Sequence, residues 1–178
     1  MTTVETTIST PVTVLPVSFP TIMDAPEFPS LLRTYAEECL VPGSAPQRAI
    51  YEAMEKAGTM QCFAASVDIA EDVSDVSTAI HCPCLIGFAS VLTTIMPHDG
   101  QRLATIESIF VDPDFRWTGA GNSLLLAAEQ HAAAVGCLAL VYTVRVDSAL
   151  ETVLSRRAGC QRTHSVFTRW LNKGGGQE

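Results

Sequence analysis

The sequence predicts a mixed α/β domain in which helices flank a largely antiparallel central sheet. Three observations support this class. Apolar residues recur at helical spacing over residues 30–58, the period changes to two from residue 60, and helical segments separate the strands after residue 118. The chain has 178 residues, of which 47% are hydrophobic and 17% charged, enough for one domain with a buried core.

The local patterns predict an ordered series of elements. In chain order these are a strand over 12–19, helices over 30–40 and 46–58, strands over 60–70, 84–96 and 103–112, a helix over 118–135, a strand over 137–146, a helix over 148–159 and a strand over 164–171. Short turns join the middle strands, which makes them antiparallel neighbours, whereas helices join the last ones. A single domain is expected over 11–172, with a flexible lead-in over 1–10 and a flexible tail over 173–178.

The helices of the first half carry start and stop signals. Prolines after Phe19 break the preceding strand. Ser30 is a suitable N-cap for the first helix, and Pro42-Gly43 ends it. Gly58 is the end signal of the second helix.

The second half is dominated by alternating segments. An acidic surface loop is expected over 71–83 and a turn over 97–102. The alanine- and leucine-rich segment 118–135 gives the strongest helix signal, and the segment 137–146 predicts a continuous apolar strand.

The charge of the chain limits the classes of partner. The net charge is −8 and the pI about 4.9. Binding to a long nucleic acid is not expected, because it depends on clustered Lys and Arg. The charge suits a cationic substrate such as an amine, although it also serves solubility. No apolar run reaches the roughly 20 residues of a membrane span and no secretory signal is found, so a cytoplasmic protein is expected.

The six cysteines are expected to be free thiols, mainly buried, because no export signal is found. The segment HCPC (His81 to Cys84) brings one histidine and two thiols together. No second ligand pair stands at zinc spacing, so no metal site is expected.

The segment RWTGAG (Arg116 to Gly121) places two glycines at the mouth of a predicted helix. A Walker loop would need a lysine, which is missing. A dinucleotide fingerprint would need a third glycine where Leu124 stands, although Asp147 follows the next strand as a ribose-binding acid would. Anion binding by the first N–H groups of the helix fits better, and a tight loop that only needs positive φ is the structural alternative.

The pattern Arg-x-x-Gly-x-Gly, with VDPDF before it and NSLLLAAE after it, resembles the coenzyme A motif of the GCN5-related N-acetyltransferase (GNAT) family. The resemblance extends from about Leu103 to Leu171 through the family's order of elements. It implies an α/β (α+β) fold with a mixed, largely antiparallel sheet of about six to seven strands, flanked by helices and splayed between the fourth and fifth strands. It also implies acetyl-CoA as the co-substrate, with no metal.

The resemblance assigns CoA binding to one continuous region. The pantetheine arm is expected to pair with the strand before the motif like an added strand. The pyrophosphate is expected at the helix N-terminus, with the Arg116 cation beside it. The residues implied are Ile109, Phe110, Val111, Arg116, Trp117, Thr118, Gly119, Ala120, Gly121, Asn122 and Ser123.

The resemblance also implies direct attack of an amine on the thioester, without a covalent enzyme intermediate. The Val111 N–H is expected to stabilise the oxyanion. Glu107 is the candidate general base, because several family members carry an acidic residue there. By alternation Glu107 shares a face with Ile109 and Val111, and apolar neighbours are expected to raise its pKa. The alternatives are that Glu107 only binds a cationic substrate or that its face meets solvent.

The acid that protonates the leaving thiolate has two candidates. The family often has a tyrosine in the last helix, four residues before a Gly-Phe pair. Ser155 stands at that position, and Cys160 replaces the aromatic residue. Tyr142 is the second candidate, with core packing as its default explanation.

The sequence therefore predicts an acyl-CoA-dependent N-acyltransferase that uses acetyl-CoA and a primary amine. The acceptor classes left open are a small amine, a protein lysine or N-terminus, and an aminated nucleoside or base. The missing tyrosine makes a catalytically degenerate CoA-binding module, for regulation or interaction, the main alternative. A nucleotide-binding fold would predict NAD affinity instead. Family members commonly form dimers, so a homodimer is compatible with the resemblance.

Overall fold

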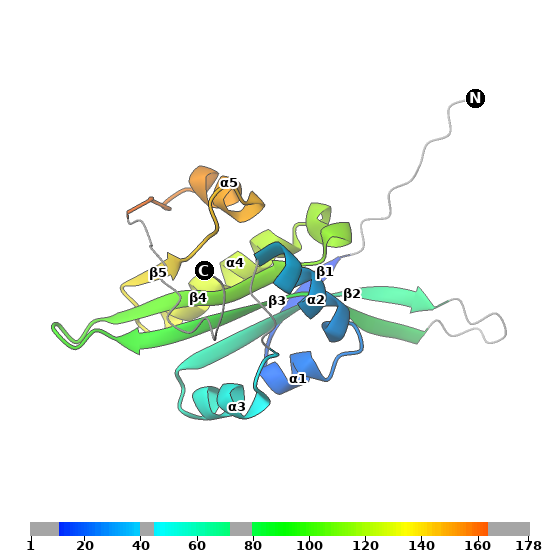
Figure 1. Ribbon diagram of the computed structural model, residues 1–178, viewed down its shortest axis with the longest axis horizontal. Helices are drawn as coiled ribbons and strands as arrows, with labels where there is room; N and C mark the ends of the chain where they lie inside the picture. Colours follow the sequence, from blue (N-terminus) through cyan, green and yellow to red (C-terminus); the bar gives the residue numbers. More distant parts are fainter. Residues whose placement is uncertain (1–10, 40–44, 72–79, 164–178) are drawn as a thin grey trace, which may run out of the picture. The chain divides into compact units, whose positions relative to one another are not determined.

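The computed structural model describes residues 11–39, 45–71 and 80–163, which divide into two units at Tyr142 (Figure 1). The first unit holds a sheet with helices on both faces, and the described part of the second unit holds one helix. The single domain expected over 11–172 stays a prediction. In the described ranges, no helix has both the length and the apolar character that a membrane span requires.

A five-stranded sheet runs through the first unit, and its strands lie in chain order. The strands are β1 (Val12–Val17), β2 (Met60–Glu71), β3 (Ile80–Ile95), β4 (Arg102–Val111) and β5 (Ala139–Tyr142). β1 to β4 pair antiparallel, and β5 pairs parallel with β4. The mixed, largely antiparallel sheet is confirmed. The expected six to seven strands are wrong for the described residues, which contain five, and the strand predicted over 164–171 lies outside them.

Three strand boundaries differ from the prediction for local reasons. β1 ends at Val17 because Ser18 caps the helix that follows. β3 begins at Ile80, so the end of the expected acidic loop belongs to a strand paired with β2. The segment predicted as a strand over 137–146 forms only the four residues of β5, because its pairing with β4 ends at Tyr142.

The described helices include the four predicted ones and two additions, a short helix before them and a 3-10 helix after β4. They are α1 (Phe19–Met23), α2 (Phe28–Cys39), α3 (Arg48–Lys56), the 3-10 helix η1 (Pro113–Thr118), α4 (Ala120–Ala134) and α5 (Ala149–Arg156). The sequence analysis missed α1, in which Ser18 accepts a hydrogen bond from the Thr21 N–H and Pro20 fits the first turn. Ser30 lies inside α2 rather than at its N-cap, because the helix already begins at Phe28.

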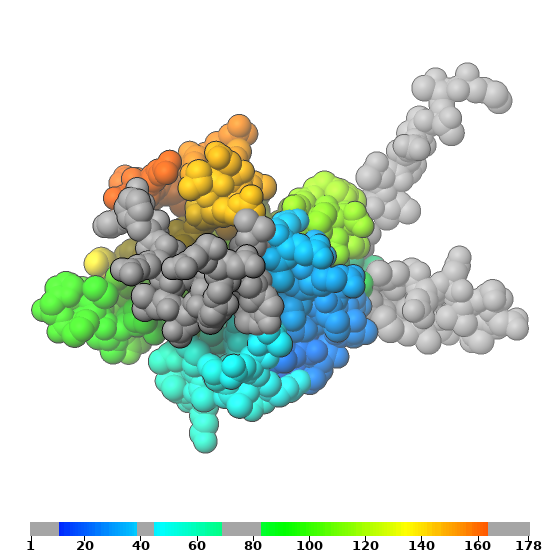
Figure 2. Space-filling view, viewed as in Figure 1, coloured from blue at the N-terminus to red at the C-terminus, as the bar shows by residue number. Residues whose placement is uncertain are grey.

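Helices cover both faces of the sheet in the first unit. α4 packs over one core, which includes Phe63, Ile86, Val91, Ile106 and Leu124. α1, α2 and α3 belong to the other face, whose core includes Phe19, Ile22, Leu31, Phe88 and Phe110. The blue and cyan atoms of these three helices lie on the side that faces the viewer in Figure 2. We refer to the two sides as the α4 face and the α1–α3 face.

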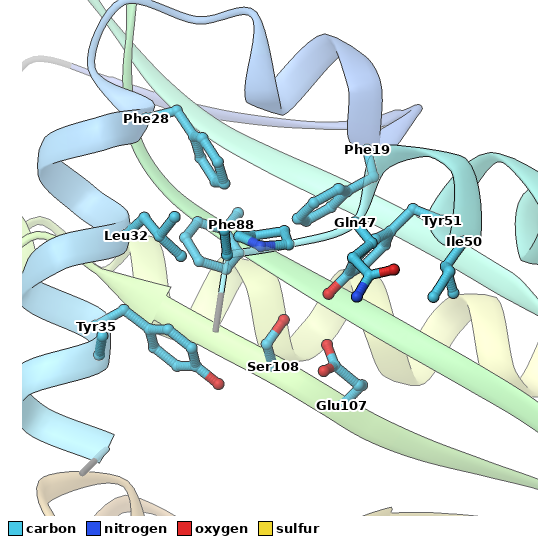
Figure 3. Close-up of a pocket in the computed structure, with 13 residues that line it drawn as sticks. Phe19, Phe28, Leu32, Tyr35, Gln47, Ile50, Tyr51, Phe88, Glu107 and Ser108 are labelled. Carbon is cyan, nitrogen blue, oxygen red and sulfur yellow. The ribbon is translucent and has the colours of Figure 1, made fainter. Parts of the chain in front are cut away.

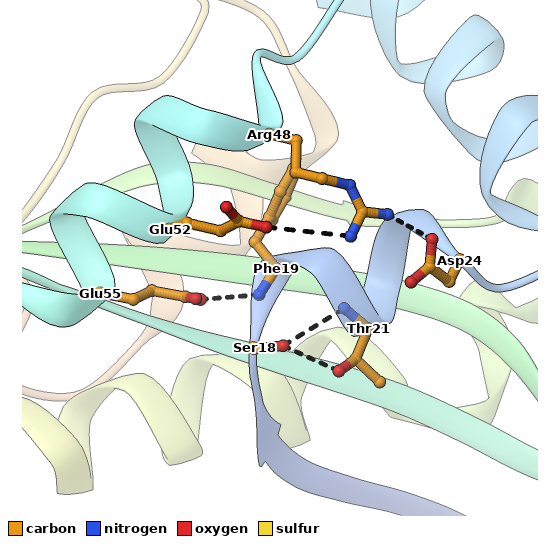
Figure 4. A network of polar contacts seen from close by, with 7 residues as sticks. All are labelled: Ser18, Phe19, Thr21, Asp24, Arg48, Glu52 and Glu55. Carbon is orange, nitrogen blue, oxygen red and sulfur yellow. Dashed lines mark hydrogen bonds and ion pairs between the residues drawn. The ribbon is translucent and has the colours of Figure 1, made fainter.

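A small polar network joins α3 to α1 (Figure 4). The Phe19 N–H donates to the Glu55 carboxylate over 2.6 Å, and Arg48 forms an ion pair with Asp24. The rings of Phe19 and Tyr51 also stack, with their centroids 3.7 Å apart. These contacts fix Tyr51 and the rest of α3 on the α1–α3 face.

Candidate active site

Glu107 occupies a β-bulge in β4. Ser90 of β3 pairs with Ser108, and the next residue, Val91, pairs with Ile106, so Glu107 is an extra residue in the ladder. Such a bulge changes the faces on which the following side chains lie. Glu107 and Ser108 consequently both line a cavity on the α1–α3 face.

The bulge overturns the prediction that Glu107 shares a face with Ile109 and Val111. Those two side chains pack with the core of the α4 face, whereas Glu107 lines the cavity on the other face. The prediction assumed an unbroken period of two, and one additional residue reverses it. The expected apolar enclosure of the carboxylate is not found either, because Glu107 is exposed.

The Glu107 carboxylate ends a short chain of hydroxyl groups. Ser90 Oγ donates to Glu107 Oε2 over 2.7 Å and lies 2.5 Å from Ser108 Oγ. A serine hydroxyl has a single proton, so Ser108 donates to Ser90 while Ser90 donates to Glu107. Among the described residues these two serines are the buried polar ones, with 0% and 7% exposure. The chain of hydroxyls therefore orients the carboxylate from inside the sheet.

A cavity of about 410 Å³ lies beside these groups (Figure 3). Aromatic side chains form much of its wall, namely Phe19, Phe28, Tyr35, Tyr51 and Phe88. In Figure 3 the side chains of Glu107 and Ser108 point from β4 toward the space between α2 and α3. Glu107 is the charged residue of this lining among the described residues. The cavity is therefore largely apolar with one carboxylate at its floor.

Tyr51 adds a neutral hydroxyl to the cavity. Burial, and next the negative charge of Glu107, raise the pKa of Tyr51 to about 12. The phenol is therefore protonated at neutral pH. The sequence analysis missed Tyr51, Ser90 and Ser108, because their proximity to Glu107 depends on the strand register and on the packing of α3.

β4 loses its β5 neighbour halfway along its length. The parallel pairs run from Leu103 to Ile106 and end there, while pairing with β3 continues to Val111. The Asp112 N–H donates to the carbonyl of Ile86, on the β3 side, over 2.9 Å. Successive N–H groups of a strand point to opposite edges, so the Val111 N–H points to the edge where β5 has ended. The two strands thus stop pairing where the resemblance implies a splay.

A tight turn connects the end of β4 to α4. The Asp112 side chain accepts a hydrogen bond from the Asp114 N–H at the start of η1, over 2.9 Å. Gly119 ends η1 and precedes α4 with a φ of +86°, a conformation that L-residues rarely adopt. α4 therefore begins at Ala120, two residues later than predicted.

The N-terminus of α4 lies beside the end of β4. Ala120 is buried, and its N–H donates a hydrogen bond to Thr118 Oγ1 over 3.3 Å. A Cβ added to Gly121 would lie 3.9 Å from Val111 Cγ2. Asn122 and Ser123 complete the first turn, and the N-cap residue has no side chain to cap it. Backbone donors of a helix N-terminus, next to a strand edge that no described strand pairs with, suit an anionic ligand.

Arg116 is already engaged in contacts within the protein. Its Nη2 lies 2.7 Å from both carboxylate oxygens of Glu38, and its Nε donates to the Val111 carbonyl over 3.1 Å. The guanidinium also lies over the ring of Phe110, 5.6 Å from its centroid. These contacts join α2 to the turn. Trp117, beside it, is 68% exposed. The predicted CoA contacts of both residues stay predictions.

The two candidate acids belong to different units of the structure. Tyr142 packs on the α4 face and donates its hydroxyl to Glu129 over 2.9 Å, whereas Glu107 lines the cavity on the opposite face. Ser155 belongs to α5 in the second unit, where its hydroxyl donates to the Glu151 carbonyl over 2.8 Å. The structure therefore does not bring Tyr142 to Glu107, and the roles of both candidates stay predictions.

Among the described residues, no three or more His, Cys, Asp or Glu side chains form a group that could hold a metal ion. Of the HCPC segment, the side chains of His81 and Cys82 lie outside the described ones. Burial, and then the hydrogen bond and charge of Glu27, raise the pKa of Cys84 to about 11, so this thiol is neutral at neutral pH.

Comparison with known proteins gives the family. A profile described as the acetyltransferase (GNAT) family matches residues 30–153, well over half of the chain. A search of curated protein sequences found no significant match. Solved structures do match, at sequence identities under 25%, where the likeness concerns the fold.

Three of these structures illustrate the match. An aminoglycoside acetyltransferase, meta-AAC0020, from an uncultured soil metagenomic sample in complex with sisomicin has a TM-score of 0.64 and 16% identity, covering 90% of this chain and 97% of that one. Glucosamine-6-phosphate N-acetyltransferase from Arabidopsis thaliana has a TM-score of 0.63 and 14% identity, covering 90% and 99%. The aminoglycoside N-acetyltransferase AAC(6')-Iy in complex with CoA has a TM-score of 0.64 and 18% identity, covering 92% and 97%. Taken with the profile match, the chain belongs to the acetyltransferase (GNAT) family, the class of enzyme that its sequence predicts.

Proposed function

We propose that this protein transfers the acetyl group of acetyl-CoA to a primary amine. One observation carries the proposal. On a single strand, β4, a carboxylate faces a cavity at Glu107, and four residues later the Val111 N–H points to the edge that β5 has left. An amine site and a thioester site on adjoining sides of one strand are what a direct acyl transfer needs.

Residues at the end of β4 and the start of α4 fit CoA as the second substrate. The segment Glu107–Val111 has an edge without β5, along which a pantetheine amide chain can pair as an added strand. The pyrophosphate fits the N-terminus of α4, where Gly119 and Gly121 leave the backbone uncovered. A related fold is known in complex with CoA, which supports this choice.

The proposed reaction needs a neutral amine and no covalent enzyme intermediate. The amine lone pair attacks the thioester carbonyl carbon and forms the C–N bond, and the carbonyl oxygen becomes an oxyanion that the Val111 N–H stabilises. Collapse of this intermediate breaks the C–S bond and releases CoA thiolate. The proton lost by the amine passes to Glu107, directly or through one water.

Glu107 is suited to take that proton. Its carboxylate accepts one hydrogen bond from Ser90, and a carboxylate has about four acceptor positions, so it can also accept from an ammonium group. Binding of a cationic amine by Glu107 without proton transfer is the alternative. In the first case Glu107 affects kcat, and in the second it affects chiefly KM.

The donor of the proton for the leaving thiolate has two candidates, and both already donate a hydrogen bond within the protein. The Tyr142 hydroxyl donates a hydrogen bond to Glu129, and the Ser155 hydroxyl donates one to the carbonyl of Glu151. Both stay candidates for this role. CoA thiolate is a modest base, so transfer without a protein acid is expected to be slow rather than absent.

The acceptor is proposed to be an amine-bearing compound. The structural relatives include enzymes named for aminoglycosides and for glucosamine-6-phosphate, which are small molecules that carry amino groups. The negative net charge favours the approach of a cation. A cytoplasmic setting, where acetyl-CoA and free thiols are both found, agrees with the free cysteines Cys62, Cys84, Cys137 and Cys160.

The proposal is tested by the release of CoA thiol from acetyl-CoA in the presence of a broad panel of primary amines. Saturable, amine-dependent release with formation of the acetylated amine is the expected result. Binding of acetyl-CoA without turnover of any amine would contradict catalysis. It would favour the degenerate CoA-binding module, which the presence of Ser155 at the position of the family's tyrosine also supports.

A further inference from the structure

The cavity beside Glu107 has an apolar part and a polar part. Phe28, Leu32 and Phe88 form the apolar part, while Ser108 and Gln47 lie nearer to the carboxylate (Figure 3). The rings support one another, since the Phe28 and Phe88 centroids lie 5.9 Å apart in an edge-to-face arrangement. Such a wall is formed before a ligand arrives, which reduces the cost of binding one.

The described lining of the cavity carries one charge. Glu107 is the charged side chain of the lining among the described residues, and the raised pKa of Tyr51, about 12, keeps that phenol neutral. A ligand with one ammonium group satisfies this arrangement. A second ammonium group inside the cavity would be desolvated without a carboxylate partner.

We infer that the acceptor is a primary monoamine carried on a compact apolar group, such as a phenyl ring on a short alkyl chain. This inference rests on the proposed function and narrows its substrate. The ammonium group lies at Glu107 and Ser108, and the apolar group lies against Phe28, Leu32 and Phe88. The volume of about 410 Å³ is at the small end of the range of about 300–1,000 Å³ for ligand sites, which suits one ring.

The same lining disfavours sugar-based polyamines. Each hydroxyl or ammonium group of such a molecule needs a hydrogen-bond partner when water is removed. Most of the lining side chains are Phe, Leu, Ile, Ala or Pro, which offer none. An aromatic wall does attract a cation, yet that attraction replaces only part of the lost hydration.

The first arm of the test compares acceptors at saturating acetyl-CoA. The probes are 2-phenylethylamine, glucosamine, spermidine and sisomicin, and the readout is kcat/KM for CoA release. The aromatic monoamine is expected to exceed each of the others by on the order of tenfold or more. The uncharged 2-phenylethanol is expected to raise the KM for 2-phenylethylamine without changing kcat, since it shares only the ring.

The second arm places a second carboxylate in the cavity wall. Ile50 lines the cavity and is 51% exposed, so Ile50→Glu changes the lining without burying a charge in the core. It is expected to raise kcat/KM for spermidine relative to that for 2-phenylethylamine by on the order of tenfold, because a second ammonium group then has a carboxylate partner, while the Kd for acetyl-CoA is unchanged. Leu15→Glu is the matched control. Leu15 is 56% exposed on β1, outside the cavity, and this variant is expected to behave as the wild type.

The outcomes separate the inference from the proposed function. Glucosamine, spermidine or sisomicin reacting as well as 2-phenylethylamine would overturn the inference and leave acetyl transfer standing. Equal effects of Ile50→Glu and Leu15→Glu would also overturn it, because the cavity would then not be the acceptor site. Absence of turnover with every amine would overturn the proposed function and the inference together.

Discussion

Glu107 owes its place in the cavity to one extra residue in β4. Without the bulge, the alternation of the strand would turn this side chain to the α4 face together with Ile109 and Val111. With the bulge, the Glu107 carboxylate faces the aromatic cavity, and the Val111 N–H still points to the edge of β4 where β5 has ended. The bulge thus places the proposed amine side and the proposed thioester side of the site on adjoining sides of one strand.

Replacing Glu107 tests its role as the base. Glu107→Gln is expected to lower kcat by about 10²-fold near neutral pH, because a positioned base contributes roughly 10²–10⁴-fold. The difference should shrink as the pH rises toward the pKa of the free amine, where the acceptor loses its proton without help. The pH dependence of kcat and kcat/KM for both proteins gives this comparison.

A matched replacement separates the base from general charge effects. Glu52 lies on α3 with 53% side-chain exposure, and Glu52→Gln removes the same charge outside the cavity lining. It should leave the pH profile unchanged. If Glu107→Gln raises only the KM, with a profile parallel to that of the wild type, Glu107 binds the amine and another group takes its proton.

The serine chain behind Glu107 gives a prediction for stability as well as rate. Ser90→Ala leaves the buried Ser108 hydroxyl without its acceptor, which is expected to cost about 1–3 kcal/mol of unfolding free energy in a urea titration. The same substitution removes the hydrogen bond that orients the Glu107 carboxylate, so kcat should fall while the Kd for acetyl-CoA stays constant. The double variant Ser90→Ala/Ser108→Ala should lose less stability than the sum of the single ones. Additive losses would show that the two hydroxyls are not coupled.

At the scale of elements, the site depends on how β4 passes into α4. The strand ends at Val111, η1 turns the chain, and Gly119 adopts a φ of +86° before the helix begins. The contacts of Arg116 with Glu38 and with the Val111 carbonyl hold this turn against α2. The helix N-terminus is thereby fixed beside the unpaired edge of the strand.

Gly119→Ala tests whether the turn binds CoA or only changes the direction of the chain. A side chain at this φ costs about 1–3 kcal/mol of stability. Gly136→Ala is the control, because Gly136 has a φ of +76° and equally open surroundings at the other end of α4. Both variants should lose similar stability in thermal unfolding, but only Gly119→Ala is expected to weaken acetyl-CoA binding, by about tenfold. Equal Kd values, measured by calorimetric titration, would make the glycine purely structural.

At the scale of the whole molecule, local signals predicted most elements. Alternation and helical spacing identified the strands of the middle sheet, α2, α3, α4 and α5. The short α1 was missed because Pro20 was interpreted as a break, although Ser18 followed by a proline is also a helix start. The turn at Gly119 was predictable because glycine is the residue that most readily adopts a positive φ.

The remaining features of the site depend on contacts between distant segments. The pairs Ser90–Ser108 and Val91–Ile106 define the bulge, and nothing in the residues around Glu107 marks it. Tyr51 reaches the cavity through the packing of α3 on α1, more than 50 positions from Glu107 in the sequence. The motif therefore predicted residues on the proposed CoA side of the site, whereas most residues on the proposed acceptor side could not be predicted from it.

Thermal unfolding with acetyl-CoA, CoA, NAD or ATP in separate samples tests the central claim most directly. A ligand at about 100 times its Kd stabilises the folded state by about 2.7 kcal/mol. For a chain of this length each kcal/mol corresponds to about 2–4 °C in Tm. The Tm is expected to rise by several degrees with acetyl-CoA and CoA, to stay constant with NAD and ATP, and to rise less in Gly119→Ala. A rise with NAD alone, or none with acetyl-CoA, would contradict a CoA site at the end of β4.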